Sequence, residues 1–234
     1  MAFETLHYMK HHQTGKSGFM GLKLDMSKAY DRLEWSYLEA LMKRMGFCDS
    51  WVALIMECIS TVSYSILVNG EPLSTIFPSR GIRQGDLLSP YLFILCTEGL
   101  HGLLASAADV GLIRGVSLCK KGPRLMHLFF ADDSVVFCRA SLAECQMIQK
   151  LLSCYERASG QMLNRCKTGL FFSKSTPTKI QIQIKDSLGV QDIKLYEKYL
   201  GLPTLVGKSK RASMDFIKER VWAKLQGWKE QLLS

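Results

Sequence analysis

Residues 125–138 read LMHLFFADDSVVFC, two apolar arms on either side of a short polar centre. Apolar arms joined by a tight polar turn are typical of a β-hairpin. The turn carries two adjacent acids, Asp132 and Asp133. Two carboxylates this close repel each other, but they are tolerated where they bind a hard divalent cation such as Mg²⁺. Taken alone, the pair also fits an ordinary structural turn.

A third acid, Asp25, ends the largely apolar run LKLD at residues 22–25. A strand there would bring its carboxylate to the same sheet edge as the 132–133 turn. Three carboxylates can bridge two metal ions about 3.5–4 Å apart, an arrangement that activates an attacking hydroxyl and neutralises the leaving group in phosphoryl transfer. The sequence therefore predicts that Asp25, Asp132 and Asp133 form one metal site.

The rest of the chain alternates helical and strand patterns. Residues 18–26 predict a strand, Asn69-Gly70 predicts a hairpin turn, and Ser141-x-x-Glu144 predicts the capped start of a helix that ends at Ser159-Gly160. Further helices are expected up to Gly46, over 51–59, over 89–104, around 180–184 and over 216–232. An α+β fold follows from this order.

The composition favours a nucleic-acid partner. Lys and Arg outnumber Asp and Glu by 30 to 21, a formal net charge of +9. The eight cysteines form no Cys-x-x-Cys pair, so no zinc ribbon is indicated. His7 and His11 have helical spacing but lack the Glu of a zinc-protease motif. Without a secretion signal or a long apolar run, we expect an intracellular protein of the nucleus or cytoplasm that does not enter a membrane.

Five blocks of this sequence resemble the reverse transcriptases (RNA-directed DNA polymerases) of plant LINE-type non-LTR retrotransposons, with group II intron maturases as more distant relatives. Residues 23–35 (KLDMSKAYDRLEW) look like motif A, 79–95 (SRGIRQGDLLSPYLFIL) like motif B and 129–133 (FFADD) like motif C. Residues 159–173 (SGQMLNRCKTGLFFS) look like motif D, and 198–205 (KYLGLPTL) like the primer-contacting segment. The resemblance covers nearly the whole chain, in the order of the family.

The resemblance implies roles for residues near the metal. Asp25 and Asp132 match the main metal ligands, with Asp133 as the second acid of motif C. Tyr30 matches the aromatic gate beside the sugar 2′ position, although a core tyrosine is the plain alternative. Lys167 matches the motif D lysine that protonates the departing pyrophosphate. An exposed lysine without that role would look the same in the sequence.

Two further blocks carry implied contacts. Gln84 and Gly85 match the residues against the incoming nucleotide and the templating base, and Leu200 and Gly201 match the primer grip. A simple turn is the alternative in both places. Family members usually have proline after Gln-Gly-Asp, where this chain has Leu87, so the motif B loop is expected to be less rigid.

The implied architecture is a right-hand polymerase palm, an antiparallel sheet backed by helices, followed by part of a helical thumb. We expect residues 1–18 to be a remnant of the fingers–palm junction, 19–174 the palm, and 175–234 the primer-contacting segment and start of the thumb. The implied reaction is nucleotidyl transfer of dNTPs to a DNA primer 3′-hydroxyl on an RNA template. Its cofactor would be Mg²⁺, with Mn²⁺ as an alternative, and the sequence does not indicate an oligomeric state.

Two other functions stay open at this level. Only about two dozen residues precede Asp25, so the chain looks like a fragment without fingers, and we expect its polymerase activity to be impaired. A catalytically inactive nucleic-acid-binding remnant of a retrotransposon is the main alternative. A palm-like nucleotide cyclase would also use an acidic turn. It would need neither the motif B block nor a primer-contacting segment.

Overall fold

The computed structural model describes residues 2–11, 18–119, 122–130, 133–190, 193, 198–199, 202–203 and 210–231. Its helices are α1 (Ala2–His11), α2 (Trp35–Arg44), α3 (Asp49–Ser60), α4 (Ser89–Asp109), α5 (Leu142–Ser159), α6 (Thr178–Leu188) and α7 (Lys210–Gln231). Its strands are β1 (Phe19–Leu24), β2 (Leu67–Val68), β3 (Glu71–Pro72), β4 (Val116–Ser117), β5 (Arg124–Leu125), β6 (His127–Phe130), β7 (Asp133–Arg139), β8 (Gly169–Phe172), β9 (Lys198–Tyr199) and β10 (Leu202–Pro203).

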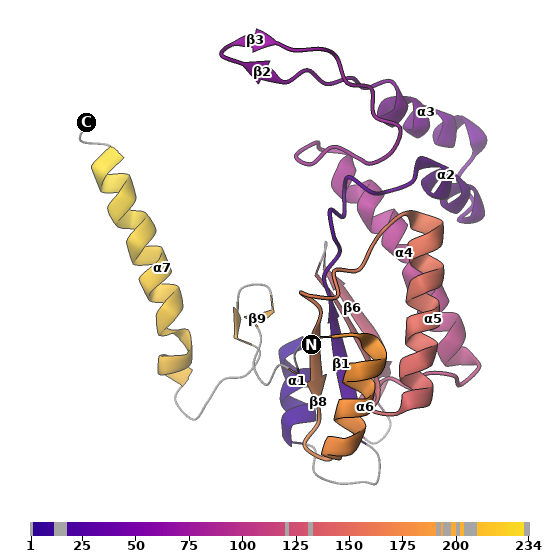
Figure 1. Ribbon diagram of the computed structural model, residues 1–234, viewed down its shortest axis with the longest axis vertical. Helices are drawn as coiled ribbons and strands as arrows, with labels where there is room; N and C mark the ends of the chain where they lie inside the picture. The colour runs from indigo at the N-terminus through magenta and orange to yellow at the C-terminus, as the bar shows by residue number, and fades with distance from the viewer. Residues whose placement is uncertain are drawn as a thin grey trace.

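A four-stranded antiparallel sheet in the order β6-β7-β1-β8 forms the centre of the fold (Figure 1). In β1, Leu22 lies opposite Val136 of β7 on one side and Leu170 of β8 on the other. The hairpin expected over 125–138 is present as β6 and β7, with Phe130 opposite Asp133. An antiparallel sheet backed by helices is the expected α+β palm, and this prediction is confirmed.

The two faces of the sheet are covered differently, because side chains alternate along each strand. The β1 residues Met20, Leu22 and Leu24 are buried in the main core, which α4, α5 and α6 complete. On the other face, Val135, Phe137 and Phe171 pack with Leu6 and Met9 of α1. This second face opens toward one end of the sheet: Phe137 is fully buried, whereas the Asp133 side chain is 33% exposed.

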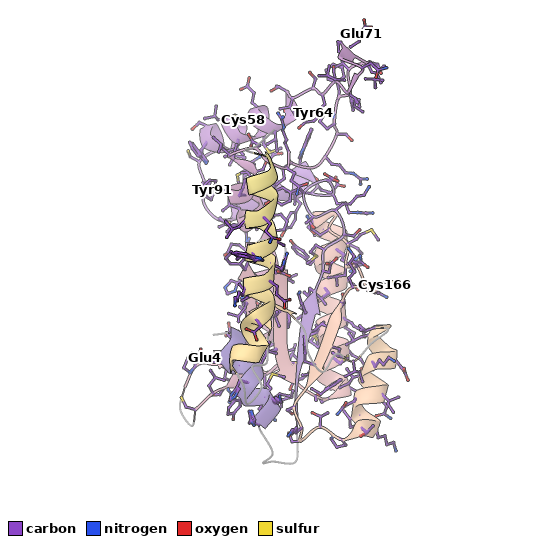
Figure 2. The ribbon with its side chains drawn as sticks, turned by 90° about the vertical axis from the view of Figure 1, so that its left-hand side faces the viewer. Glu4, Cys58, Tyr64, Glu71, Tyr91 and Cys166 are labelled. Atoms are coloured by element: carbon purple, nitrogen blue, oxygen red, sulfur yellow. The ribbon has the colours of Figure 1, made fainter. Side chains whose placement is uncertain are left out.

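A second apolar cluster lies beyond the sheet. It joins α2, α3, the first turns of α4 and the chain around Ala29 and Leu33. Long, apolar α4 is the only helix in the described residues whose length and composition would suit a membrane span, but its Phe93 packs in this cluster and its Leu100 and Leu104 pack in the main core. The β2–β3 hairpin extends away from this cluster, with Glu71 at its far end and Tyr64 nearer the helices (Figure 2).

Most elements begin and end where local sequence signals indicate. Ser141 caps α5 by accepting a hydrogen bond from the Glu144 amide, and Gly160 ends α5 in a left-handed conformation. The Glu144 carboxylate accepts bonds from the Arg114 and Arg139 amides, so it ties the helix start to the sheet. The 69–70 turn has both residues at positive φ, as an Asn-Gly hairpin requires.

Helices α4 and α1 and strands β2 and β3 differ from the sequence-based expectation. Helix α4 continues to Asp109, five residues past the expected end at Leu104, because the following alanine-rich turn favours helix and buries Ala107. Helix α1 was not predicted. Among its described residues, Leu6 and Met9 are the only buried apolar ones, and two such residues make a weak helical pattern in the sequence. Strands β2 and β3 have only two residues each. The domain limits at residues 18 and 174 stay predictions.

We expect Gly160→Ala to destabilise the fold more than Gly189→Ala. Both glycines end a helix at positive φ, so each alanine costs about 1 kcal/mol of backbone strain. A Cβ at Gly160 would also collide with the Arg32 carbonyl oxygen, whereas the space around Gly189 is open. The expected losses in free energy of unfolding are about 2–4 kcal/mol for Gly160→Ala and about 1 kcal/mol for Gly189→Ala, measured by urea denaturation. Equal losses would contradict the close packing at Gly160.

Acidification should destabilise the protein through His127. The pKa of His127 is lowered to about 4, first by burial and then by the neighbouring His101. The two rings approach to 3.0 Å between the His101 Nδ1 and the His127 Nε2. An unfolded histidine titrates near 6.5, so the unfolded state binds more protons between pH 4 and 6.5, and stability in this window rises with pH. We expect a loss of about 1–2 kcal/mol between pH 7 and pH 4, allowing for solvent screening at this half-buried site. His127→Gln should flatten the profile, and the exposed His7→Gln should not.

Candidate active site

Asp25 and Asp133 lie at the same end of the central sheet, Asp25 just after the last residue of β1 and Asp133 at the first residue of β7. Leu24 is paired with Ser134, and continuing this register by one residue would bring Asp25 across from Asp133. Residues opposed in an antiparallel pair have Cβ atoms about 4.5–5.5 Å apart and point to the same face. The two acids are 108 positions apart in the sequence, and the pairing of β1 with β7 brings both to this end of the sheet.

Asp132 lies outside the described residues. The residues on either side of it in the chain are described: Phe130 and Asp133 are paired, and only Ala131 and Asp132 separate them in the sequence. The strand that follows Asp133 is rigid: Val135, Val136 and Phe137 are at most 1% exposed. This buried strand holds the backbone that carries the Asp133 carboxylate in place, and a metal ligand needs such a fixed position.

The donor chemistry at this edge fits a hard divalent cation. Asp25 and Asp133 are both half-buried, and oxygen donors of this kind are what Mg²⁺ and Mn²⁺ bind. No group of three or more acidic, histidine or cysteine side chains suited to a metal occurs within the described residues, which include two of the three expected acids. Lys23 adds a positive charge, with its Nζ 3.3 Å from the Asp133 Oδ1.

The motif D loop joins the same end of the sheet from the β8 side. The Asn164 amide donates to the Asp25 carbonyl oxygen at 2.8 Å, and the Ser27 amide donates to the Met162 carbonyl oxygen at 2.8 Å. Lys167 is exposed two residues before β8, and its amide donates to the Asn164 carbonyl oxygen at 3.0 Å. Cys166, next to Lys167, marks this loop in Figure 2. The structure therefore brings Lys167 to the end of the sheet where Asp25 lies.

Buried Gln161 supports this loop from below. Its side-chain Nε2 donates to the Ala29 carbonyl oxygen at 2.6 Å, across 132 positions of sequence. Glu156 of α5 accepts a bond from the Leu163 amide at 2.8 Å. These two contacts join α5, the motif D loop and the turn that follows Asp25. Neither residue was among the predicted site residues, and a glutamine in a loop carries no sequence signal for burial.

Tyr30 lies between motif A and the motif B helix. Its ring stacks on Phe93 of α4, with centroids 5.0 Å apart and planes inclined by 11°. Its carbonyl oxygen accepts a bond from the Ile82 amide at 2.9 Å. The side chain is half-buried, so one part of the ring packs in the core and another reaches the surface. This placement suits a steric gate and a core tyrosine equally.

The motif B loop presents Gln84 and Gly85 to solvent, with Gly85 at a φ of +90°. The loop is fixed at its end by Asp86, whose carboxylate accepts bonds from the Leu88 and Ser89 amides and from the Ser89 hydroxyl. Partial desolvation opposes the change, but these bonds hold the pKa of Asp86 below its usual value. Asp86 thus anchors the start of α4 beside Leu87, where family members usually have proline.

Two arginine side chains make contacts on the other side of this loop. The Arg83 guanidinium lies over the Tyr64 ring, 5.9 Å from its centroid, and Arg80 pairs with Glu34 at 3.3 Å.

Leu200 and Gly201, the expected primer grip, lie outside the described residues. The flanking strands β9 and β10 pair antiparallel, with Tyr199 opposite Leu202.

Comparisons with known proteins give the family and the relatives of this chain. A family model described as "Reverse transcriptase (RNA-dependent DNA polymerase)" matches residues 1–204. The uncharacterized mitochondrial protein AtMg01250 of Arabidopsis thaliana is 53% identical over 68 residues, which cover 29% of this chain and 56% of that protein. The 149 kDa protein of transposon TX1 from Xenopus laevis is 26% identical over 70% of this chain and 12% of its own length.

Two further comparisons concern a retrotransposon and a solved structure. The Pol polyprotein of the type-1 retrotransposable element R2 of Popillia japonica is 30% identical over 54% of this chain and 20% of its own length. Telomerase from Candida albicans superposes with a TM-score of 0.58 at 15% identity, over 89% of this chain and 32% of that chain. The chain spans between about an eighth and just over half of these relatives. It belongs to the reverse transcriptase family, among the enzymes of LINE-type non-LTR retrotransposons.

Proposed function

We propose that this chain is the catalytic palm of a LINE-type reverse transcriptase, which adds dNTPs to the 3′-hydroxyl of a DNA primer on an RNA template. One observation supports the proposal: the β1–β7 register ends with Leu24 opposite Ser134, so the next residues, Asp25 and Asp133, lie at the same end of the sheet. Motifs A, C and D converge there, and Tyr30 links motif A to motif B. A structural turn would not require this convergence.

Asp25, Asp132 and Asp133 are the residues that would hold the metal ions. When bound, Mg²⁺ or Mn²⁺ would lower the cost of deprotonating the primer hydroxyl and neutralise charge on the phosphates. The contribution of the chain is positioning, because paired β-strands hold the backbone that carries Asp133 and ends at Asp25. Phosphoryl transfer depends mainly on such positioning and charge neutralisation.

The other site residues would contact the nucleotide, the template and the primer. Tyr30 would lie against the sugar C2′ edge, and Gln84 and Gly85 would lie against the nucleotide and the templating base. Lys167, from the Asp25 end of the sheet, would donate a proton to the departing pyrophosphate. Leu200 and Gly201 would position the primer. The net charge of +9 suits a nucleic-acid duplex as the partner.

Primer extension tests the proposal directly. The chain is incubated with a DNA primer on an RNA template, dNTPs and Mg²⁺ or Mn²⁺, and a DNA template of the same sequence serves as comparison. We expect templated extension that requires the metal. Binding of the primer–template without extension under either metal would reject catalysis and favour the non-catalytic nucleic-acid-binding remnant.

A further inference from the structure

β1 contains a single charged residue, Lys23, at a place where an apolar residue would be expected. Lys23 lies two residues before Asp25, a spacing that puts both side chains on the same face of an extended chain. Across the sheet it faces Val135 on β7 and Gly169 on β8. Val135 belongs to the apolar cluster that α1 covers. A lysine beside such a cluster costs free energy unless its ammonium group has a partner.

The Asp133 carboxylate is a partner of this ammonium group. The Lys23 Nζ lies 3.3 Å from the Asp133 Oδ1, and the two side chains are only 19% and 33% exposed. Replacing a partly buried ion pair by apolar residues is often neutral or even stabilising. Stability alone therefore does not explain a lysine here, and its contact with an expected metal ligand points to a function in the metal site.

We infer that Lys23 is a counter-ion of the metal site. In the metal-free protein its ammonium group pairs with the Asp133 carboxylate, and it releases this carboxylate when divalent cations bind. The inference rests on the proposed function, because it takes Asp25 and Asp133 as metal ligands. In the metal-free protein, Lys23 offsets repulsion between neighbouring carboxylates. In the metal-bound protein, it repels the cations and lowers their affinity.

Direct metal binding is the first test. Mn²⁺ is titrated calorimetrically into the wild-type chain, Lys23→Met and Lys23→Arg, without nucleic acid or dNTP. Lys23→Met removes the charge and should bind Mn²⁺ about tenfold more tightly, whereas Lys23→Arg should stay near wild type. Lys43→Met is the matched control, because Lys43 also pairs with a carboxylate, Glu39 at 2.7 Å, but does so on the surface of α2, outside the central sheet.

The outcomes separate this inference from the proposed function. If the wild-type chain binds no Mn²⁺, the metal site itself is refuted and the inference falls with it. If the wild-type chain binds Mn²⁺ and Lys23→Met binds it equally or more weakly, the metal site stands and the counter-ion role is overturned.

A second measurement uses the wild-type chain, so that it does not depend on folding of a variant. Lysines are acetylated briefly with and without Mg²⁺, and modification of each is quantified by mass spectrometry. Release from Asp133 should raise the reactivity of Lys23 several-fold when Mg²⁺ is present, while that of Lys43 should not change. Unchanged or reduced reactivity of Lys23 in a protein that binds the metal would overturn the inference.

Discussion

Asp25→Asn should reduce primer extension at least about a thousandfold while leaving the fold intact. The amide keeps the shape of the side chain but loses the charge that holds a divalent cation. A metal site stabilises the phosphoryl-transfer transition state by several kcal/mol, and about 4 kcal/mol corresponds to a thousandfold in rate. The structural contact of Asp25 is made by its backbone, since its carbonyl oxygen accepts the Asn164 amide. That contact survives the substitution.

Asp25 is the cleaner test than Asp133. Asp133→Asn would also leave the Lys23 ammonium group without that carboxylate, so lost activity could follow from a local rearrangement. Asp132→Asn should match Asp25→Asn. Asp186→Asn is the control, because Asp186 is an exposed carboxylate on α6, outside the sheet. Rates come from single-turnover extension, with folding checked by thermal denaturation. Full activity of Asp25→Asn would refute the metal assignment.

The sequence was sufficient to predict what depends on local signals. The 125–138 hairpin, the strand before Asp25 and both ends of α5 follow from alternation, turn residues and caps, and all are confirmed. The order of motifs added the family and its palm. Each of these features depends on residues close together in the chain.

Contacts between distant segments could not be predicted in this way. A strand pattern does not specify its register, so the sequence predicted that Asp25 and Asp133 share a sheet edge but not that Leu24 pairs with Ser134. The same holds for Lys23 with Asp133, since a lysine in a strand usually signals a solvent-exposed position. The hydrogen bond from the Gln161 side chain to the Ala29 carbonyl oxygen joins residues 132 positions apart. Nothing in the local sequence marks Gln161 as buried.

Tyr30→Val should relax sugar selectivity, raising ribonucleotide relative to deoxynucleotide incorporation by roughly a hundredfold. A gate acts by steric exclusion of the 2′-hydroxyl, and valine lacks the ring that would exclude it. Discrimination of one small group by the shape of a pocket is worth about 10–200-fold, which sets the expected size. The measurement compares kcat/KM for a ribonucleotide and its deoxynucleotide at one template position.

The stacking of Tyr30 on Phe93 requires two controls. Loss of an aromatic pair costs about 0.5–1.5 kcal/mol of stability, so Tyr30→Val will unfold at lower urea concentration whatever its role. Tyr30→Phe keeps the ring and should keep the selectivity. Phe93→Leu removes the stack but leaves the tyrosine, and its selectivity should change far less than that of Tyr30→Val. If Phe93→Leu relaxed selectivity as much as Tyr30→Val, or if Tyr30→Val left it unchanged, Tyr30 would be a core residue that supports α4 and not the gate.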